Sequence, residues 1–470
     1  MKNVSAILLI LCVAVTASQA TQYYLATAAD GGSDSNSGTS PSTPWLTPNH
    51  AVNCGDVIIA KASNSYAGAS FSNTFGTVTC PAGNNVAWLE CATFDGCKIS
   101  GAGGFAIGNS YWGVQGWEVS SIGENACFAA YPPNGSIHHV IFANNVANGC
   151  GANGFATFNL GNNGVDYVAF VGNIAYNAAQ NNAECYSGFS IYQPVQSDSV
   201  SGTHIYVAGN FAWDNVDPNP CAGGTPSDGE GLIFDTFDGS QGGLPSPFAA
   251  QAVAENNIFF HNGGAGIAVF NNQAGTANAT IYLRYNTLWG NQTGNNQNAT
   301  YCGEVDVTFA NNVQLYYNVV QTNYEYACTN NPLYDFFMGY TNSSDAVYSN
   351  IGYSAYGTYD GVNNSPTFSY AISNAWGVNP NYVNPSDQTA PSCGGTTSVP
   401  NCMSTVISNF TTQASAANGW GRQPVSSTQT SDSLFPQWLC NVNLPTGLIT
   451  MHCVTPVPPA PPTGLTAAVK

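Results

Sequence analysis

The chain has 470 residues, of which 6 are lysine or arginine and 25 are aspartate or glutamate, giving a formal net charge of −19 at pH 7. This charge excludes nucleic acid as a partner, because proteins hold a phosphate backbone with many cations. Polyanionic sugars are repelled as well unless Ca²⁺ bridges them to the carboxylates of the protein, whereas neutral glycans are not.

Residues 1–20 have the features of a secretory signal peptide. Lys2 precedes an apolar run over residues 6–15, and small residues around Ala20 form a cleavage site. No later stretch approaches the roughly 20 apolar residues that a membrane helix needs. We therefore expect a secreted, soluble, monomeric chain that is cleaved near Ala20, starts near Thr21 and has no membrane partner.

The cysteines fit an exported protein. Cys12 is one of 15 cysteines and leaves with the signal peptide, so an even number remains in a compartment that permits disulfides. Cys91 with Cys97 and Cys393 with Cys402 are close enough for local disulfides, while the other pairings stay open. The spacing of cysteine and histidine shows no zinc-binding pattern.

A degenerate segment recurs along the chain, in which an asparagine follows an alternating apolar strand. The gaps between successive aligned asparagines are 28, 37, 47, 29, 32 and 32 residues, which is the spacing of a solenoid. Asparagine suits a tight corner because it tolerates the left-handed conformation, and its amide can bond to the asparagine one coil away. The aligned residues are Asn145, Asn173, Asn210, Asn257, Asn286, Asn318 and Asn350.

A second short strand follows a glycine in four of these coils, at Gly154, Gly188, Gly231 and Gly266. Stacked short strands of period two without a helical pattern predict an all-β, single-stranded parallel β-helix with lateral loop insertions. We expect this domain over residues 21–453, with its coils clearest over 100–353 and a tail that packs back after Tyr353. Residues 454–470 are proline-rich and predict an extended linker.

Three aligned columns carry candidate site residues, because strands of neighbouring coils lie about 4.8 Å apart. In the strand after each glycine, Tyr192, Asp235 and Phe270 stack on the outer face, as a carboxylate between two aromatic rings. This arrangement suits a sugar subsite, and a solvated aspartate beside surface aromatics is the alternative.

The longest coil, of 47 residues, carries six carboxylates in a chain that has few charges. Such a cluster could hold Ca²⁺, supply an acid and base pair, or do both, and a structural Ca²⁺ site or an acidic loop is the alternative. We assign Asp228, Glu230 and Asp235 to catalysis. The predicted metal ligands are Asp214, Asp217 and Asp238.

Four residues after the ladder asparagines, Asp214 and His261 should lie one coil apart. His261 could act as an oriented general base, or the pair could be a plain surface hydrogen bond. Trp213 and Trp289, in the preceding column, could line a groove or pack under a loop.

Arg284 is one of the few basic residues of the chain and is a candidate substrate ligand. Its alignment with Glu255 one coil earlier predicts a cross-strand salt bridge as the simpler account.

Three local motifs and the start of the chain resemble the pectate-lyase-like superfamily of right-handed parallel β-helices, and more narrowly its secreted bacterial members. The motifs are DGEG at 228–231, NNIFFHNGGAGI at 256–267 and NTLWGN at 286–291, and the resemblance covers roughly residues 23–353. It implies a right-handed coil and an ancestry of polysaccharide-binding grooves. The catalytic signatures of polygalacturonases and classical pectate lyases are absent, so no catalytic residue is carried over.

The leading hypothesis is therefore a glycoside hydrolase on a neutral cell-wall glycan, such as a β-glucan or xylan, that uses two carboxylates. A Ca²⁺-dependent lyase on pectate-like uronate chains is the second hypothesis, and it needs Arg284 released from Glu255, or His261 as its base. A non-catalytic glycan-binding adhesin is the third, for which a stable solenoid with aromatic columns suffices.

Overall fold

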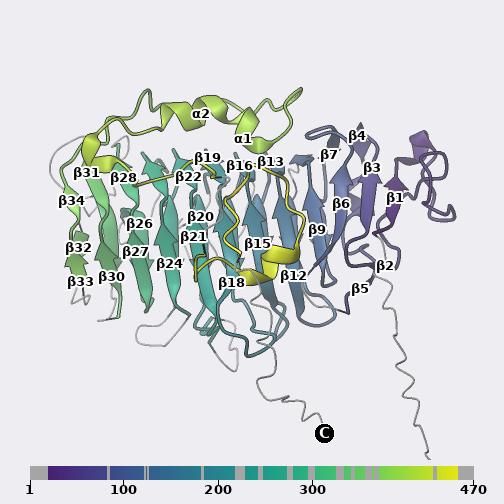
Figure 1. Ribbon diagram of the computed structural model, residues 1–470, viewed down its shortest axis with the longest axis horizontal. Coiled ribbons are helices and arrows are strands. Elements are labelled where there is room, and N and C mark those ends of the chain that lie inside the picture. The colour runs from purple at the N-terminus through teal and green to yellow at the C-terminus, as the bar shows by residue number, and fades with distance from the viewer. Residues whose placement is uncertain are drawn as a thin grey trace, which may run out of the picture.

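The computed structural model describes residues 20–81, 85–120, 123, 126–180, 185–217, 228–241, 247–272, 279–294, 302–323, 333–339, 344–354, 362–364, 370–426 and 431–453. The predicted signal peptide up to residue 19 and the predicted linker at 454–470 lie outside these ranges. In the described part, the chain winds through three long parallel sheets, to each of which successive coils add one strand (Figure 1).

The first sheet runs along one side of the solenoid, and its strands pair in parallel throughout. Its described strands, in spatial order, are β1 (Gln22–Leu25), β3 (Val57–Ala60), β6 (Ala87–Cys91), β9 (Trp112–Gln115), β12 (Ile137–Ala143), β15 (Val165–Val171), β18 (Thr203–Ala208), β21 (Gln251–Glu255), β24 (Ile281–Arg284), β27 (Val313–Tyr316), β30 (Ala346–Tyr348) and β33 (Tyr370–Ile372).

The second sheet follows the first after a tight corner. Its described strands are β4 (Ser63–Tyr66), β7 (Cys97–Ser100), β10 (Trp117–Ser120), β13 (Val146–Asn148), β16 (Ile174–Tyr176), β19 (Phe211–Trp213), β22 (Ile258–Phe260), β25 (Thr287–Trp289), β28 (Val319–Thr322), β31 (Ile351–Ser354) and β34 (Ala375–Trp376).

The third sheet completes each coil. Its described strands are β8 (Phe105–Ile107), β11 (Phe128–Ala130), β14 (Phe155–Thr157), β17 (Phe189–Tyr192), β20 (Leu232–Asp235), β23 (Ile267–Phe270), β26 (Gly303–Thr308), β29 (Tyr334–Gly339) and β32 (Val362–Asn364). A short pair, β2 (Val52–Asn53) with β5 (Val78–Thr79), lies near the N-terminal end.

The predicted asparagine ladder is confirmed at the corner between the first and second sheets. Asn257 Oδ1 accepts hydrogen bonds from the backbone N–H and the Nδ2 of Asn210, at 2.9 and 3.0 Å, and its own Nδ2 donates to the Val207 carbonyl at 3.0 Å. The same pattern runs from Asn145 to Asn374. Each asparagine thereby satisfies backbone groups that the tight corner removes from the sheets.

The predicted backbone conformation of these asparagines is wrong. The left-handed residue is the one before each ladder asparagine, as at Asn144, Gly209, Asn256 and Tyr285, with φ between +55° and +67°. The ladder asparagine therefore contributes the hydrogen bonds of its side-chain amide, whereas the preceding residue adopts the left-handed backbone conformation of the corner.

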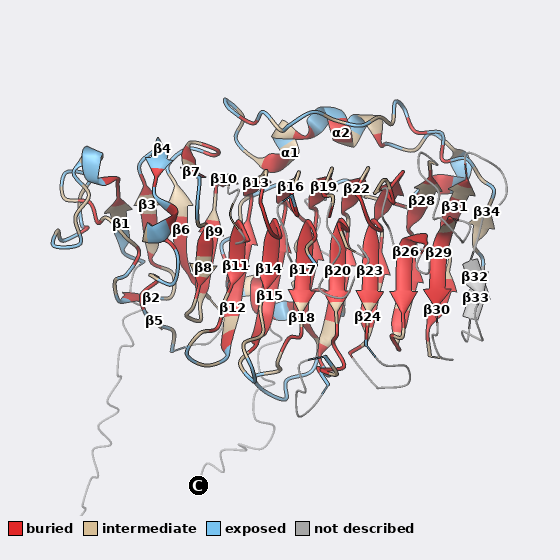
Figure 2. Ribbon diagram, turned by 180° about the vertical axis from the view of Figure 1, so that it is seen from behind, coloured by how far each residue is buried: buried red, intermediate tan, exposed pale blue. Residues whose placement is uncertain are grey.

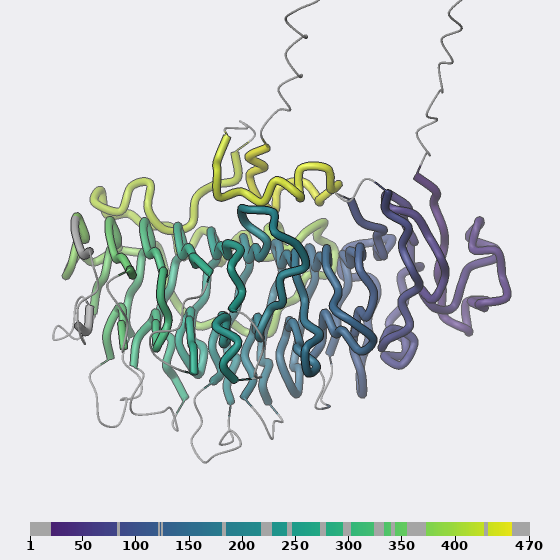
Figure 3. Tube along the Cα trace, turned by 90° about the horizontal axis from the view of Figure 1, so that it is seen from below, coloured from purple at the N-terminus to yellow at the C-terminus, as the bar shows by residue number. Residues whose placement is uncertain are grey.

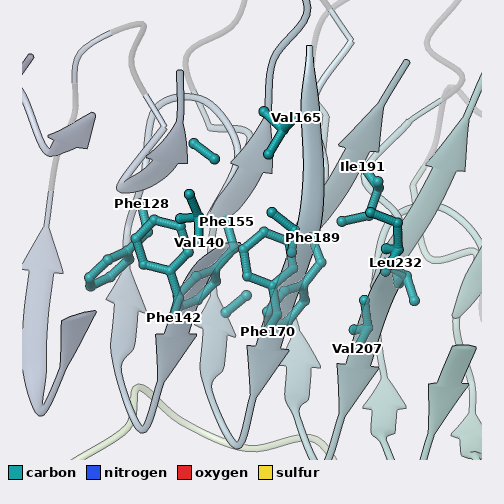
Figure 4. Packing of buried hydrophobic residues seen from close by; sticks show 14 of the residues in the cluster. Phe128, Val140, Phe142, Phe155, Val165, Phe170, Phe189, Ile191, Val207 and Leu232 are labelled. Carbon is teal, nitrogen blue, oxygen red and sulfur yellow. The ribbon is translucent and has the colours of Figure 1, made fainter. Parts of the chain in front are cut away.

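The core is a stack of like residues inside the coil. Phe105, Phe128, Phe155 and Phe189 occupy the same position in four successive strands of the third sheet, with ring centroids 5.2, 4.7 and 4.8 Å apart. Figure 4 shows the last three of these rings. All four are fully buried. Offset stacks of this kind add to the apolar burial that holds the coils together.

Five disulfides are present among the described residues. Cys91–Cys97 and Cys393–Cys402 confirm the two predicted local pairs. The others are Cys54–Cys80, Cys127–Cys150 and Cys440–Cys453. This number of disulfides fits an extracellular protein.

After β34 the chain returns along the solenoid as a tail, residues 377–453. It carries α1 (Val399–Cys402) and α2 (Ser404–Asn409) along the outer face of the second sheet and then crosses the outer face of the first sheet (Figures 1 and 3). The tail thus packs back over the middle coils. No helix in the described ranges is long and apolar enough to cross a membrane.

The tail makes apolar and polar contacts along this path. Phe410 packs against Phe260 with ring centroids 4.9 Å apart, and Trp438 lies edge-on to His139 at 5.2 Å. Figure 2 shows the third sheet from its outer side, where no described segment crosses it. The described part of the tail therefore leaves the outer face of the third sheet uncovered.

Candidate active site

The outer face of the third sheet has the register that the sequence predicts. Tyr192 pairs with Asp235, and Asp235 pairs with Phe270, in adjacent strands β17, β20 and β23. The stack continues to Thr308 in β26, and the neighbouring outer column brings Ala268 beside Asp306. The alignment of the predicted column is confirmed, and its role in sugar binding stays a prediction.

A cavity of about 330 Å³ opens on this face. Its lining brings together three of the predicted catalytic residues, Asp228, Glu230 and Asp235, with the predicted aromatic ligand Phe270. It also contains Asp306, which sequence reasoning missed. The strand GEVDVT after Cys302 repeats the glycine-plus-strand pattern of the earlier coils, so extending that alignment by one coil would have placed Asp306 here.

Glu230 is buried, with 4% of its surface exposed. The Ser187 hydroxyl donates a hydrogen bond to Glu230 Oε2 at 2.6 Å. Burial raises the pKa of the Glu230 carboxyl well above its usual range, and the charge of Asp228 raises it further, against the effect of Ser187. Glu230 therefore keeps its proton to a higher pH than an exposed glutamate does.

Asp306 is the second buried carboxyl of the cavity, at 8% exposed. Gln292 Nε2 lies 3.4 Å from Asp306 Oδ2, while Asp306 Oδ1 and the nearby Thr308 hydroxyl have no hydrogen-bond partner among the described residues. Burial raises the pKa of Asp306 well above its usual range. Unpartnered buried polar atoms are costly, so these two atoms point to a ligand or water in the cavity.

Asp235 differs from both. It is partly buried, and the Thr236 hydroxyl donates to Asp235 Oδ1 at 2.5 Å. Burial raises the pKa of Asp235 to about 6, against the effect of this hydrogen bond. The cavity thus contains one carboxyl with a pKa of about 6 and one whose pKa is raised well above its usual range, and acid and base catalysis uses two carboxyls in different environments.

No lysine or arginine lines this cavity within the described part of the chain. Lys61 pairs with Asp30 at 2.5 Å, and Lys98 contacts Glu118. Arg422 is half-buried in the tail, with its guanidinium 5.8 Å from the Phe211 ring. The cavity therefore offers carboxylates and hydroxyls, but no fixed positive charge.

The structure places Arg284 in the first sheet, away from the cavity. Its Nε lies 2.5 Å from Glu255 Oε2 and its Nη2 lies 2.6 Å from Asp432 Oδ2. The cross-strand salt bridge is present, so in this arrangement Arg284 is unavailable as a substrate ligand.

Trp213 and Trp289 lie beneath the tail, at 1% and 8% exposed. They pack with Phe260 and Phe410 in one apolar cluster. Of the two alternatives for this aromatic column, packing under another segment is the one that the structure shows. A sugar ring has no access to these indoles while the tail is docked.

The structure does not bring the three predicted metal ligands together. Asp217 is buried at 2% exposed, and Asp238 accepts a hydrogen bond from the Ser240 hydroxyl at 2.8 Å in the turn after β20. Asp214 instead accepts a hydrogen bond from His261 Nδ1 at 2.7 Å, as its predicted position one coil away requires. His261 is therefore absent from the lining of the cavity.

No protein-family model and no curated protein sequence matches the chain. Among solved structures, the A-module of a mannuronan C-5 epimerase from Azotobacter vinelandii is 14% identical, covers 68% of this chain and 86% of its own, and has a TM-score of 0.40. A pectate lyase is 15% identical, with coverage of 89% and 95% and a TM-score of 0.36.

A lacto-N-biosidase from Eubacterium ramulus is also similar, at 12% identity, with coverage of 76% and 67% and a TM-score of 0.33. These similarities concern the fold alone, and the activities of those proteins are not carried over to this chain. The three parallel sheets and the stacked coils confirm the predicted fold, a right-handed parallel β-helix.

Proposed function

We propose that the chain is a secreted glycoside hydrolase that cleaves a neutral polysaccharide in the cavity of the third sheet. The observation that carries this proposal is the difference in pKa between Glu230, raised well above its usual range, and Asp235, raised to about 6. Glycoside hydrolysis needs one carboxyl that holds a proton and a second that is ionised.

In this mechanism Glu230 is the general acid and protonates the oxygen of the glycosidic bond as that bond breaks. Asp235 is ionised above about pH 6 and either activates water or attacks the sugar carbon. Phe270 and Tyr192, on either side of Asp235, offer faces for sugar rings. Asp306 and Thr308 supply polar groups for sugar hydroxyls.

The charge of the chain supports a neutral substrate. The net charge is −19, and no described lysine or arginine reaches the cavity to neutralise a uronate. Secretion, which the predicted signal peptide implies, fits a polymer that lies outside the cell.

A Ca²⁺-dependent lyase is the second candidate. The unpartnered Asp306 Oδ1, near Asp228 and Asp235, favours it, because Ca²⁺ binds carboxylate oxygens and could bridge a uronate to the protein. Against it, no three acidic or histidine side chains of the cavity meet at metal-binding distance among the described residues.

The test is to incubate the purified protein with neutral and uronate-containing polysaccharides, with Ca²⁺ or a chelator. Reducing ends and the ultraviolet absorbance of unsaturated products are followed together. We expect reducing ends on a neutral glycan without that absorbance. If reducing ends and absorbance both rise and are lost with chelator, the protein is the lyase instead. If neither signal rises on any polysaccharide, a binding protein is favoured.

Glu230→Gln tests the assigned acid, and we expect kcat to fall about 10²- to 10⁴-fold with little change in KM. Asp198→Asn, an exposed carboxylate beside the first sheet, is the matched control and should retain full activity. The wild-type kcat/KM should fall as the pH drops below about 6, because Asp235 takes up a proton there. Equal losses in both variants would remove Glu230 from the mechanism.

A further inference from the structure

Three side chains meet at a place that the cavity does not include. His261 Nδ1 lies 2.7 Å from Asp214 Oδ1 and 3.5 Å from Asp387 Oδ1. One potential ligand atom from each residue lies within 4.8 Å of the other two, and they form the one such group among the described residues. Asp214 and His261 come from the β-helix, whereas Asp387 comes from the tail.

The geometry points to a binding site for a divalent transition-metal ion, which we propose fixes the tail to the β-helix. The two β-helix residues are rigid. Both occupy the left-handed corner after a second-sheet strand, with φ of +53° for Asp214 and +54° for His261, and the Asp214 N–H donates to the His261 carbonyl at 3.2 Å. A corner repeated from coil to coil holds both side chains in fixed directions, as a metal site requires.

The third ligand is held by local structure in the tail. The Gln388 N–H donates to Asp387 Oδ1 at 2.7 Å, and Tyr382, five residues earlier, packs against Phe410 with ring centroids 5.6 Å apart. Asp387 has 49% of its side chain exposed, against 23% for His261 and 25% for Asp214. The site is therefore open to solvent on the tail side, so an ion can enter and water can complete its coordination.

The ligand set selects the kind of metal. One imidazole and two carboxylates suit Zn²⁺, which takes nitrogen and oxygen ligands at about 2.0–2.2 Å and four-coordinate geometry. Ca²⁺ is a poor match because it takes 6–8 oxygen ligands. When the ion binds, His261 Nδ1 gives up the proton that it donates to Asp214, either to solvent or to Nε2, and uses its lone pair for the metal.

The bound ion would hold the tail over the aromatic side chains of the second sheet. Trp289 and Phe260 lie beneath Phe410 of the same tail, and the covering segment is also tied by Val399 N–H to Asn144 Oδ1 at 2.7 Å. A metal at Asp387 adds an anchor upstream of these contacts. This proposal is independent of the hydrolase, since none of the three ligands lines the cavity.

The experiment measures Zn²⁺ binding to the chelator-treated full chain by calorimetry, with the unfolding temperature read in parallel. We expect one Zn²⁺ per chain, a higher Tm with Zn²⁺ and little response to Ca²⁺. Asp387→Asn should weaken Zn²⁺ binding by about tenfold or more and abolish the rise in Tm.

Asp34→Asn is the matched control. Asp34 Oδ1 lies 3.3 Å from His50 Nε2, in a histidine–aspartate pair near the N-terminal end that lacks a third ligand in the described part of the chain. This variant should bind Zn²⁺ as the wild type does. Absence of Zn²⁺ binding, or binding that Asp387→Asn leaves unchanged, would overturn the proposal and leave the three residues as a hydrogen-bonded contact. Hydrolysis that persists in chelator would leave the proposed function intact.

Discussion

Buried carboxylates on the faces of the solenoid that the tail covers differ from those on the third sheet, which the tail leaves uncovered. Beneath the tail, Glu255 is paired with Arg284, and on the same sheet Asp166 is paired with His204 at 2.8 Å. On the bare third sheet, Glu230 and Asp306 are buried without a cation, and their pKa values rise instead. The carboxylates of these two pairs are compensated by a cation or a histidine, whereas two carboxyls without a cation among the described residues lie in one cavity, as in many functional sites.

Removing the side chain of Trp438, with which the tail covers the first sheet, should cause the largest loss of stability. Trp438 is 6% exposed and packs edge-on against His139 and Tyr167 of the first sheet. We expect Trp438→Ala to lower the free energy of unfolding by about 3–5 kcal/mol, while the activity of the folded protein stays unchanged. Urea unfolding measures the loss, and Val200→Ala, at a valine that is 59% exposed, is the control. An unchanged unfolding curve would show that the tail is not a structural cover.

Removing the Arg284 cation from the first sheet should lower the free energy of unfolding by slightly less. Arg284→Met leaves Glu255 buried at 5% exposed and without its charge partner, while Asp432 can turn to solvent. We expect a loss of about 3 kcal/mol in chemical denaturation. Lys61→Met, which breaks an exposed pair with Asp30, should cost under about 1 kcal/mol. Similar costs for the two variants would contradict the contrast drawn between the two faces.

Glu304 is another buried carboxyl without a cation in the described part of the chain, and its effect on the stability of the fold can be tested by changing the pH. It is fully buried and ends a second asparagine ladder, where it accepts hydrogen bonds from the N–H and Nδ2 of Asn291 at 2.9 and 2.7 Å. Burial raises the pKa of Glu304 to about 8. The folded state therefore holds a proton that the unfolded state has lost above about pH 4.5, so this group destabilises the fold as the pH rises from about 4.5 to 8.

Glu304→Gln keeps an acceptor for Asn291 but cannot ionise. The decline in unfolding free energy with rising pH should become less steep by up to about 1.4 kcal/mol per pH unit. Unfolding curves recorded across this range for both proteins measure the difference. Parallel declines would mean that Glu304 is ionised in the folded protein.

What the sequence predicts well is whatever repeats from coil to coil. The ladder at Asn257, the register of Asp235 with Phe270 and the contact of Asp214 with His261 all follow from one alignment, because stacked coils place equal positions side by side. Asp306 was within reach of the same alignment, one coil further on.

The tail could not be predicted in this way, because it has no repeat and its contacts are far apart in sequence. No sequence pattern therefore predicts that Asp387 lies beside His261. For the same reason, the sequence could not decide that Trp213 and Trp289 are covered. Aromatic residues in a column have the same pattern whether they face a ligand or another segment, and only the path of the tail distinguishes the two.

The smallest expected effect concerns the aromatic that the tail leaves uncovered. Tyr192 lies one strand from Asp235, between the cavity and a second depression of about 200 Å³ that Tyr131 and Phe158 help to line. If a polymer extends along this face, Tyr192→Ala removes one stacking surface, worth about 1 kcal/mol. KM for the polymer should rise roughly three- to tenfold while stability hardly changes.

Tyr282→Ala, on the first sheet, should leave KM unchanged. Steady-state kinetics on long and short oligomers of the same glycan separate the outcomes, since a subsite at Tyr192 matters only for chains long enough to reach it. An equal rise in KM for the shortest cleavable oligomer would place Tyr192 at the reacting sugar, and no rise for any length would mean that the substrate leaves the cavity in another direction.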